Sequence, residues 1–220
     1  MLHTSALTLF LDGAPLLTLP PLRVAPGEVL TLMGPSGCGK SSLLAALAGV
    51  LPPGGPIRLT GDILLGARRL TPLPPQERGV GILFQDDLLF AHLTVAENLM
   101  FGMPAHLKGM AARQTRAREA LAEVGLEAQA DKLPGALSGG QKARVSLLRA
   151  LLAEPRALLL DEPFSRLDKP LRAAFRTLVF ERLRTQAIPA LLVTHDEEDA
   201  PGTILQLIPP VIPEEEHHLV

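Results

Sequence analysis

This chain of 220 residues carries the sequence Gly34-Pro35-Ser36-Gly37-Cys38-Gly39-Lys40-Ser41, which matches the phosphate-loop pattern G-x-x-x-x-G-K-[ST] at every fixed position. The apolar run 29–33 before it predicts a buried parallel strand, and the good helix formers of residues 42–49 after it predict a helix that ends at a glycine. Glycines let successive backbone N–H groups converge on phosphate oxygens, and the helix N-terminus adds a partial positive charge. The motif in this setting predicts that the chain binds a nucleoside triphosphate.

Individual residues of the loop have separate expected roles. Lys40 is expected to reach the β- and γ-phosphates, and the hydroxyl of Ser41 is expected to bind Mg²⁺. The whole stretch, with Ser42 after it, is expected to contact the phosphates. The alternative is a glycine-rich turn that matches the pattern by chance, and the flanking strand and helix argue against it.

The composition indicates one globular domain. Apolar residues make up 47% of the chain and charged residues 20%, which is typical of a folded domain. With 21 basic and 23 acidic residues the formal net charge is -2, which gives no reason to expect nucleic acid as a partner. The single cysteine, Cys38, excludes an internal disulfide and fits a reducing compartment. Because neither a secretory signal nor an apolar run of the ~18 residues that span a bilayer is recognisable, we expect a soluble chain.

Strand patterns early in the chain predict an antiparallel sheet beside the parallel one. Residues 7–11 and 16–19 read as two strands with a turn between them, and residues 57–65 read as a further hairpin. Residues 94–125 have a helical pattern, with Thr94 and Glu97 as a capping box at its start. The expected fold class is α/β, a phosphate-loop NTPase core with a mixed parallel sheet, an N-terminal antiparallel β-subdomain and an inserted α-helical subdomain.

Two more buried strands end in acidic or amide side chains. Residues 79–84 lead to Gln85, which stands where ligands bind in an open parallel sheet, although an ordinary polar residue at a strand end is the alternative. Residues 157–160 lead to Asp161 and Glu162. Because side chains alternate along a strand, Asp161 can face Mg²⁺ in the phosphate loop while Glu162 orients and deprotonates a water molecule.

A second anion-binding helix end is predicted at Leu137-Ser138-Gly139-Gly140-Gln141. Ser138 is a natural N-cap for a helix over residues 142–153, and the two glycines expose backbone N–H groups at its start. Further on, the buried strand 191–194 leads to His195, which is either a structural residue or a contact to the γ-phosphate.

The order of these motifs resembles the nucleotide-binding subunit of ABC transporters. The resemblance extends from about residue 7 to about residue 199 and includes Ser165-Arg166-Leu167-Asp168, and the pentapeptide 137–141 is highly specific to that family. Residues 82–99 are similar to bacterial importers of the molybdate, thiamine, iron and polyamine type. The resemblance implies an ATPase that uses ATP and Mg²⁺ and serves a bacterial importer.

The resemblance also implies a role for each motif. It implies an ATP-sandwich homodimer in which Ser138, Gly139 and Gly140 of one copy close on the γ-phosphate held by the phosphate loop, residues 34–41, of the other. It implies Gln85 on Mg²⁺ and facing the transport partner, Glu162 as general base and His195 as the γ-phosphate switch. Asp168 would communicate across the dimer.

The implied organisation is a single ABC ATPase domain with a core of residues 1–85 and 138–200, a helical subdomain of residues 86–137, and a poorly ordered tail of residues 201–220. The implied partners are a second copy of the chain, transmembrane permease subunits and an extracytoplasmic solute-binding protein, with no nucleic acid. The implied location is cytoplasmic, peripheral on the inner face of the cell membrane through the permease.

Three features depart from the family pattern. The chain has no Tyr and no Trp, so Phe10 or Leu11 stands near the place where the family usually stacks adenine on an aromatic residue, and base selectivity is expected to be weak. No closing strand is recognisable after His195, and Glu214-Glu215-Glu216-His217-His218 reads as disordered. A C-terminal regulatory domain is also missing, so regulation through one is not expected.

Rival functions leave motifs unexplained. A DNA-repair ABC protein would need a long coiled-coil insertion, for which residues 86–136 are too few, and a translation-associated one would have two cassettes. A plain phosphate-loop kinase or GTPase has no use for residues 137–141. A soluble ABC-type ATPase that is not coupled to transport, associated with DNA or the ribosome, is the alternative function.

Overall fold

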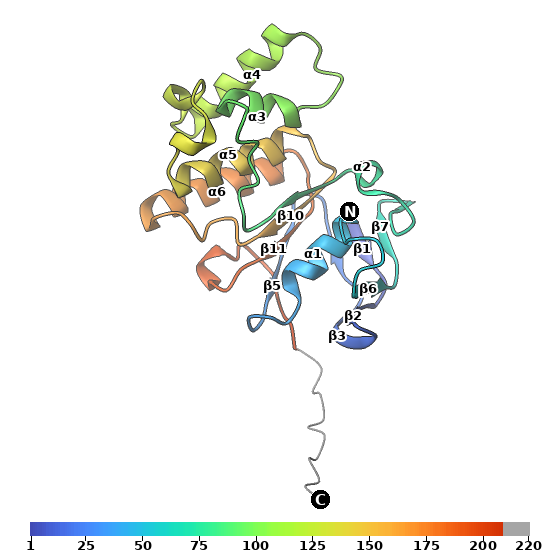
Figure 1. Ribbon diagram of the computed structural model, residues 1–220. Coiled ribbons are helices and arrows are strands. Elements are labelled where there is room, and N and C mark those ends of the chain that lie inside the picture. The colour runs from blue at the N-terminus through green and yellow to red at the C-terminus, as the bar shows by residue number, and fades with distance from the viewer. Residues whose placement is uncertain (209–220) are drawn as a thin grey trace, which may run out of the picture.

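The computed structural model describes residues 1–208, and a five-stranded parallel sheet forms its centre (Figure 1). The strand order is β12-β5-β11-β10-β9, and every neighbouring pair is parallel. The strands are β5 (Val29–Met33), β9 (Val80–Leu83), β10 (Ala157–Asp161), β11 (Ala190–Val193) and β12 (Ile204–Gln206). Every residue of β5, β10 and β11 is buried, as expected for parallel strands that helices cover on both faces.

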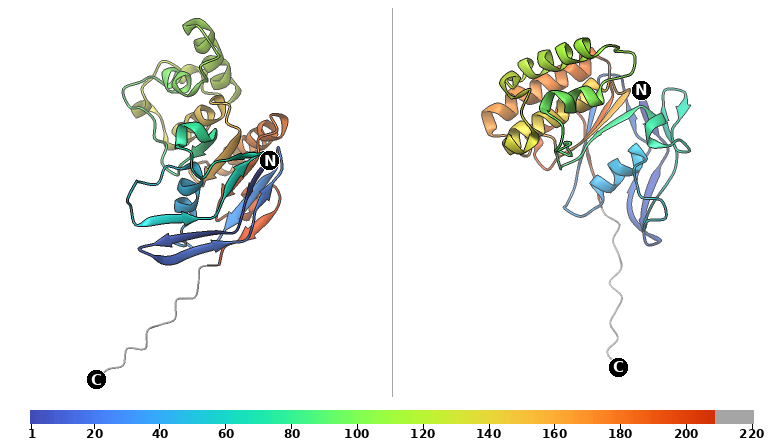
Figure 2. Two further views of the ribbon diagram at one scale, coloured as in Figure 1. Left: turned by 90° about the vertical axis from the view of Figure 1, so that its right-hand side faces the viewer. Right: turned by 45° about the horizontal axis from the view of Figure 1, so that its top comes forward.

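Helices pack on both faces of this sheet. Figure 2 shows α1 (Lys40–Ala48) between the central sheet and the N-terminal strands, with α5 (Gly139–Leu152) and α6 (Lys169–Thr185) on the other side. Leucines of α1 share one apolar cluster with residues of the N-terminal strands and of β10 and β11. The helix ends at Gly49 in the left-handed conformation, as predicted.

The N-terminal strands form two antiparallel sheets. One has the order β4-β1-β7-β8 and the other β3-β2-β6, which confirms the prediction of antiparallel sheet beside a parallel one. The strands are β1 (Leu2–Thr4), β2 (Leu7–Leu11), β3 (Ala14–Leu19), β4 (Arg23–Val24), β6 (Ile57–Thr60), β7 (Ile63–Leu65) and β8 (Arg68–Arg69).

The predicted hairpin over residues 57–65 is wrong. Both strands exist, but β6 pairs with β2 and β7 pairs with β1, so the chain passes from one sheet to the other between them. Gly61 makes this crossing at φ 104, where a Cβ would lie 2.4 Å from the carbonyl oxygen of Ala6. The amide of Asp62 donates to the Ser5 hydroxyl at 2.8 Å. The glycine therefore marks a change of sheet rather than a hairpin turn.

Three α-helices lie between β8 and α5, and the helical stretch predicted over residues 94–125 is interrupted once. The helices are α2 (Pro75–Arg78), α3 (Val95–Gly102) and α4 (Met110–Glu123), with 3-10 turns at Glu127–Gln129 and Pro134–Ala136. The capping box of Thr94 and Glu97 is confirmed. The predicted helical stretch breaks after α3 because Met103 precedes Pro104 and is therefore extended. The α4 residue Arg113 donates to the carbonyl oxygens of Met103 and Pro104 and closes this break.

The end of the described chain corrects one expectation. A closing strand does follow His195, because β12 extends the sheet parallel to β5 and the amide of Leu207 donates to the carbonyl of Met33 at 2.6 Å. Three residues after Pro201-Gly202 are too short a pattern to be recognised as a strand. The expected disorder of residues 214–218 lies outside the described residues. Among the helices of residues 1–208, none combines the length and apolar composition that crossing a membrane requires.

Candidate nucleotide site

The carboxyl ends of the parallel strands meet at one edge of the sheet, around a cavity of about 350 Å³. The loop after β5, the residue Gln85 beyond β9 and the end of β10 all line it. This is the position where open parallel sheets bind ligands. The cavity brings together nine of the residues that the sequence predicts for the site: Ser36, Gly37, Gly39, Lys40, Ser41, Ser42, Gln85, Asp161 and Glu162.

The phosphate loop takes a shape that its glycines permit. Gly37 and Gly39 have φ values of 79 and 95, in the left-handed region that favours glycine. A Cβ on Gly39 would lie 2.9 Å from Cδ2 of Leu16, because the β2–β3 hairpin packs against the loop. Nζ of Lys40 donates to the carbonyl oxygens of Gly34 at 2.9 Å and Pro35 at 2.8 Å. The loop thus curls around its own lysine, and α1 begins directly after it.

A buried carboxylate faces the loop from β10. Asp161 is 4% exposed, and burial raises the pKa of its carboxyl, while a hydrogen bond with the Ser41 hydroxyl and the charge of Lys40 lower it. Burial of a carboxylate is unfavourable unless a positive charge or hydrogen bonds accompany it. Asp161 together with the Ser41 hydroxyl therefore suits a bound cation. One carboxylate and one hydroxyl suit Mg²⁺, which takes its remaining ligands from phosphates and water.

Glu162 and His195 form a contact at the same edge. Nδ1 of His195 lies 3.1 Å from Oε1 of Glu162. Glu162 has φ 47, an uncommon left-handed conformation, and its amide donates to the carbonyl of Val193 at 2.9 Å. The side chain of His195 is 67% exposed, so its free edge is open to a ligand. The sequence left a structural role open for His195, and the family resemblance implies a catalytic role for Glu162. The structure places these two residues next to each other.

The second predicted anion site lies elsewhere in the chain. Ser138 caps α5 and forms a capping box with Gln141, which confirms the predicted N-cap. The helix begins three residues earlier than expected, at Gly139, so both glycines lie in its first turn. None of residues 138–141 lines the phosphate-loop cavity, nor does Asp168, which caps α6 by accepting from the amide of Leu171 at 3.1 Å. The two helix N-termini that the sequence predicts to bind anions therefore belong to different helices, α1 and α5.

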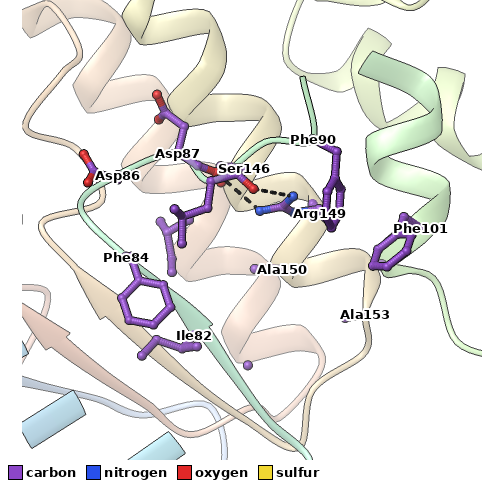
Figure 3. A pocket seen from close by; sticks show the side chains of 14 residues that line it. Ile82, Phe84, Asp86, Asp87, Phe90, Phe101, Ser146, Arg149, Ala150 and Ala153 are labelled. Carbon is purple, nitrogen blue, oxygen red and sulfur yellow. Dashed lines mark hydrogen bonds between the residues drawn. The ribbon is translucent and has the colours of Figure 1, made fainter. Parts of the chain in front are cut away.

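An apolar groove of about 310 Å³ beside Gln85 was not predicted from the sequence (Figure 3). The rings of Phe90 and Phe101 meet at 4.6 Å between centroids, and the Arg149 guanidinium lies 5.6 Å from the Phe90 ring. Phe101 is 66% exposed and Leu88 is 59% exposed. The signal available in the sequence was the gathering of Phe84, Phe90 and Phe101 in a chain with only 3% aromatic residues.

A short segment, Asp86 and Asp87, links this groove to the phosphate-loop cavity. It is held by α5 and by Arg166, which precedes α6. Ser146 and Arg149 of α5 donate to the carbonyl oxygen of Asp87, the latter at 3.3 Å (Figure 3). Arg166 pairs with Asp86 at 3.0 Å and with Asp87 at 2.9 Å. Burial raises the pKa of the Asp87 carboxyl, and the charge of Arg166 opposes that shift. The groove is thereby tied to α5, the helix that Ser138 caps.

Comparison with known proteins adds a family and a set of relatives. The family model described as ABC transporter matches residues 20–165. An uncharacterized ABC transporter ATP-binding protein of Escherichia coli (strain K12), YnjD, is 49% identical over 202 residues, which cover 92% of each chain. The thiamine import ATP-binding protein ThiQ of Vibrio vulnificus (strain YJ016) is 44% identical over 81% of this chain and 74% of its own.

A third relative is longer. The Fe(3+) ions import ATP-binding protein FbpC 1 of Rhizobium meliloti (strain 1021) is 42% identical over 81% of this chain, which spans only 49% of that protein. Among solved structures, the dimeric ATP-binding cassette MJ0796 bound to ADP and Pi superposes with a TM-score of 0.80 at 27% identity, over 94% of both chains. A second dimeric MJ0796 structure matches with the same TM-score at 28% identity.

Proposed function

Because the chain belongs to the ABC transporter family and is an ATPase of that type, we propose that it is the ATP-hydrolysing subunit of a bacterial importer and drives solute uptake through a separate membrane permease. The observation that carries this proposal is the joint presence of the phosphate-loop cavity and an open apolar groove, connected through Gln85 and the two aspartates after it. The names of the iron and thiamine import relatives support the importer class.

The phosphate loop binds the triphosphate of ATP. Its backbone N–H groups and the N-terminus of α1 face the phosphate oxygens, and Lys40 supplies a positive charge to the β- and γ-phosphates. Ser41, Asp161 and Gln85 are the residues that would hold Mg²⁺, which neutralises charge that develops on the phosphates. Phe10 or Leu11 of β2 is the proposed contact for the base.

Hydrolysis depends on Glu162 and His195. Glu162 orients a water molecule for in-line attack on the γ-phosphorus and accepts its proton. His195, held at Glu162 through Nδ1, keeps its other ring nitrogen available for the γ-phosphate. The contact between His195 and Glu162 joins residues just beyond the ends of β10 and β11. It therefore holds the Glu162 carboxylate in place before the nucleotide binds.

The reaction needs a second copy of the chain. We assign the first turn of α5, Ser138 to Gln141, to the γ-phosphate held by the partner copy, with Asp168 beside it at the junction. The dimeric MJ0796 cassettes support this arrangement. Two bound nucleotides then draw the two copies together, and closure of the dimer is the mechanical output.

The groove is the proposed docking site for the permease. Residues 86–137 form the proposed helical subdomain, and the groove lies where this subdomain meets the core of residues 1–85 and 138–200. Its exposed Phe101 and Leu88 suit an apolar segment of a membrane protein. The chain would then be cytoplasmic and peripheral on the inner face of the membrane, with an extracytoplasmic solute-binding protein as a further partner. The alternative function is that of an ATPase associated with DNA or the ribosome and without a transport partner. It gives no role to this apolar groove.

The test recovers tagged Glu162→Gln protein from its native membranes with Mg-ATP and identifies the proteins that come with it. We expect a polytopic membrane protein, and we expect Phe101→Glu in the same background to lose it while ATP-dependent dimerisation persists. Lys108→Glu, a charge change at an exposed residue that does not line the groove, is the control. If the protein comes with a ribosome, with nucleic acid or with no partner, the result contradicts the transport proposal.

A further inference from the structure

Asp199 is a buried carboxylate that the proposed reaction does not use. Its residue is 2% exposed, and it lies at the end of the 3-10 turn Glu197–Asp199, just after His195. Burial of a charge is unfavourable unless the charge is paired and hydrogen-bonded. Asp199 meets this condition fully: it accepts from Nε of Arg172 at 2.9 Å and from the Thr194 hydroxyl at 3.2 Å, and it pairs with Arg176 at 3.4 Å.

The partner of Asp199 belongs to α6. Arg172 makes a two-pronged contact with Asp199 and also pairs with Asp196 at 2.9 Å. The hydrogen bond with Asp199 is the main reason that the pKa of the Arg172 guanidinium is raised. The amide of Arg172 donates to the carbonyl of Asp168 at 2.8 Å, one turn from the start of the helix. The arginine therefore joins the loop after β11 to the N-terminal turn of α6.

The network holds the residues on both sides of His195. Thr194 donates to Asp199, and the amide of Asp196 donates back to the Thr194 hydroxyl at 3.1 Å. The Asp196 carboxylate is bound by Arg172 and accepts from the amide of Glu198 at 3.0 Å. The side chain of His195 has one polar contact in the described structure, the one to Glu162. Apart from that contact, the network holds His195 in place through the residues on either side of it, Thr194 and Asp196.

We propose that Arg172 and Asp199 are positioning residues, which hold the loop of His195 so that its ring meets Glu162 and which tie this geometry to the start of α6 at Asp168. The inference rests on the proposed function for the catalytic roles of Glu162 and His195. It goes beyond that function because it names the pair through which a movement at Asp168 reaches the hydrolytic residues. Neither residue lines the nucleotide cavity, so their effect on the reaction is indirect.

The first experiment measures Asp199→Asn, which keeps the size of the side chain and removes its charge. We expect kcat for ATP to fall by about tenfold to 10²-fold while the KM changes little, because the reacting groups are displaced and the phosphate loop is untouched. Glu123→Gln is the matched control, since it removes another ion pair of α6, that of Arg182, far along the helix. It should leave kcat unchanged.

The second measurement is the imidazole ¹⁵N spectrum of His195, assigned by its loss in His195→Gln. We expect the Nδ1 signal to move in Asp199→Asn toward its position in Glu162→Gln, and to stay in place in Glu123→Gln. This readout needs no turnover, so it tests the positioning role even if Glu162 is not the base. An unchanged signal together with an unchanged kcat would overturn the proposal.

A third variant separates positioning from simple stabilisation. Arg172→Met combined with Asp199→Leu replaces the ion pair by an apolar pair of similar size, a change that buried ion pairs often tolerate. We expect thermal stability near that of the wild type but a kcat as low as that of Asp199→Asn. Recovery of both stability and kcat would show that the pair only supports the fold. If Asp199→Asn does not fold, this double variant carries the test.

Discussion

Nδ1 of His195 and Oε1 of Glu162 lie 3.1 Å apart, just beyond the ends of two adjacent parallel strands. The register pairs Asp161 of β10 with Val193 of β11, so the residues that follow leave the sheet side by side. The register therefore brings the two residues to the same edge of the sheet, where the loop after β11 completes the contact. Of the two residues, Glu162 lines the phosphate-loop cavity and His195 lies beside it.

Glu162→Gln is expected to lower the turnover of ATP by about 10²–10⁴-fold, because the amide cannot accept a proton from water. The binding of ATP should persist, since the phosphate loop is unchanged. Steady-state hydrolysis and equilibrium binding of a fluorescent ATP analogue measure the two effects. Glu181→Gln, on the exposed side of α6, is the control. Wild-type turnover in Glu162→Gln would show that the base is a different residue.

Gly39→Ala is expected to destabilise the nucleotide-free chain more than Gly37→Ala. Both positions have positive φ, which costs an alanine roughly 1–2 kcal/mol. A Cβ at Gly39 would also lie 2.9 Å from Leu16 and 3.3 Å from Leu9, whereas at Gly37 nothing lies within 4 Å. The clash adds about 1–3 kcal/mol. Urea unfolding of both variants measures the difference, and equal destabilisation would contradict the packing of β2 and β3 on the loop.

Asp161→Asn should change how stability depends on pH. Because burial raises the pKa of the Asp161 carboxyl above its ordinary value of 3.8, the folded chain holds this proton more tightly than the unfolded chain. The stability that the proton supplies is lost as pH rises from 3.8 through the folded-state pKa, and the asparagine variant does not lose it. Without nucleotide, its urea midpoint should fall less toward neutral pH than that of the wild type.

Mg-ATP provides the control for this variant. The ligand should raise the midpoint of the wild type at neutral pH and raise that of Asp161→Asn much less, since a ligand that binds the folded state stabilises it more when it binds more tightly. Parallel pH profiles for the two proteins would mean that the Asp161 carboxyl does not carry the raised pKa.

Discrimination between ATP and GTP is expected to be weak. Leu11 is 39% exposed on β2, Phe10 beside it is partly buried, and the chain has no Tyr or Trp to supply a larger ring. An aromatic stack is worth about 0.5–1.5 kcal/mol, so its absence leaves a KM for GTP within roughly tenfold of that for ATP. Leu11→Trp should lower the KM for ATP. A preference for ATP of several hundredfold in the wild type would reveal a base contact elsewhere.

The parts of the site that sequence predicts well are those that local chemistry determines. The phosphate loop, the N-cap at Ser138 and the polar residues at the ends of β9, β10 and β11 each depend on a few consecutive residues. Strand pairing is not local. The sequence of residues 57–65 contains two good strands, and only contacts with β1 and β2 assign them to different sheets.

The apolar groove was missed for the same reason. Phe90 and Phe101 come from one part of the chain and Arg149 from α5, so no short motif describes the surface that they form. The pair of Arg172 and Asp199 joins residues that lie 27 positions apart. The short strand β12 was missed because three residues carry too little periodicity, although the sheet edge at β5 gives them a partner.

The most direct measurement concerns the claim that two copies of the chain complete each nucleotide site. Lys40→Ala removes the lysine of the phosphate loop. Gly139→Asp puts a negative charge at the first residue of α5, where a new Cβ meets nothing within 4 Å, so the helix tolerates it while it repels a phosphate from the partner copy. Each variant alone should be nearly inactive.

An equal mixture of the two variants should then recover about a quarter of the wild-type rate, because half of the dimers are mixed and each mixed dimer holds one intact site of two. The rate is followed at protein concentrations that allow dimers to form with ATP. Recovery would establish that the phosphate loop of one copy works with the Ser138 helix of the other. A mixture no more active than the sum of its parts would contradict this.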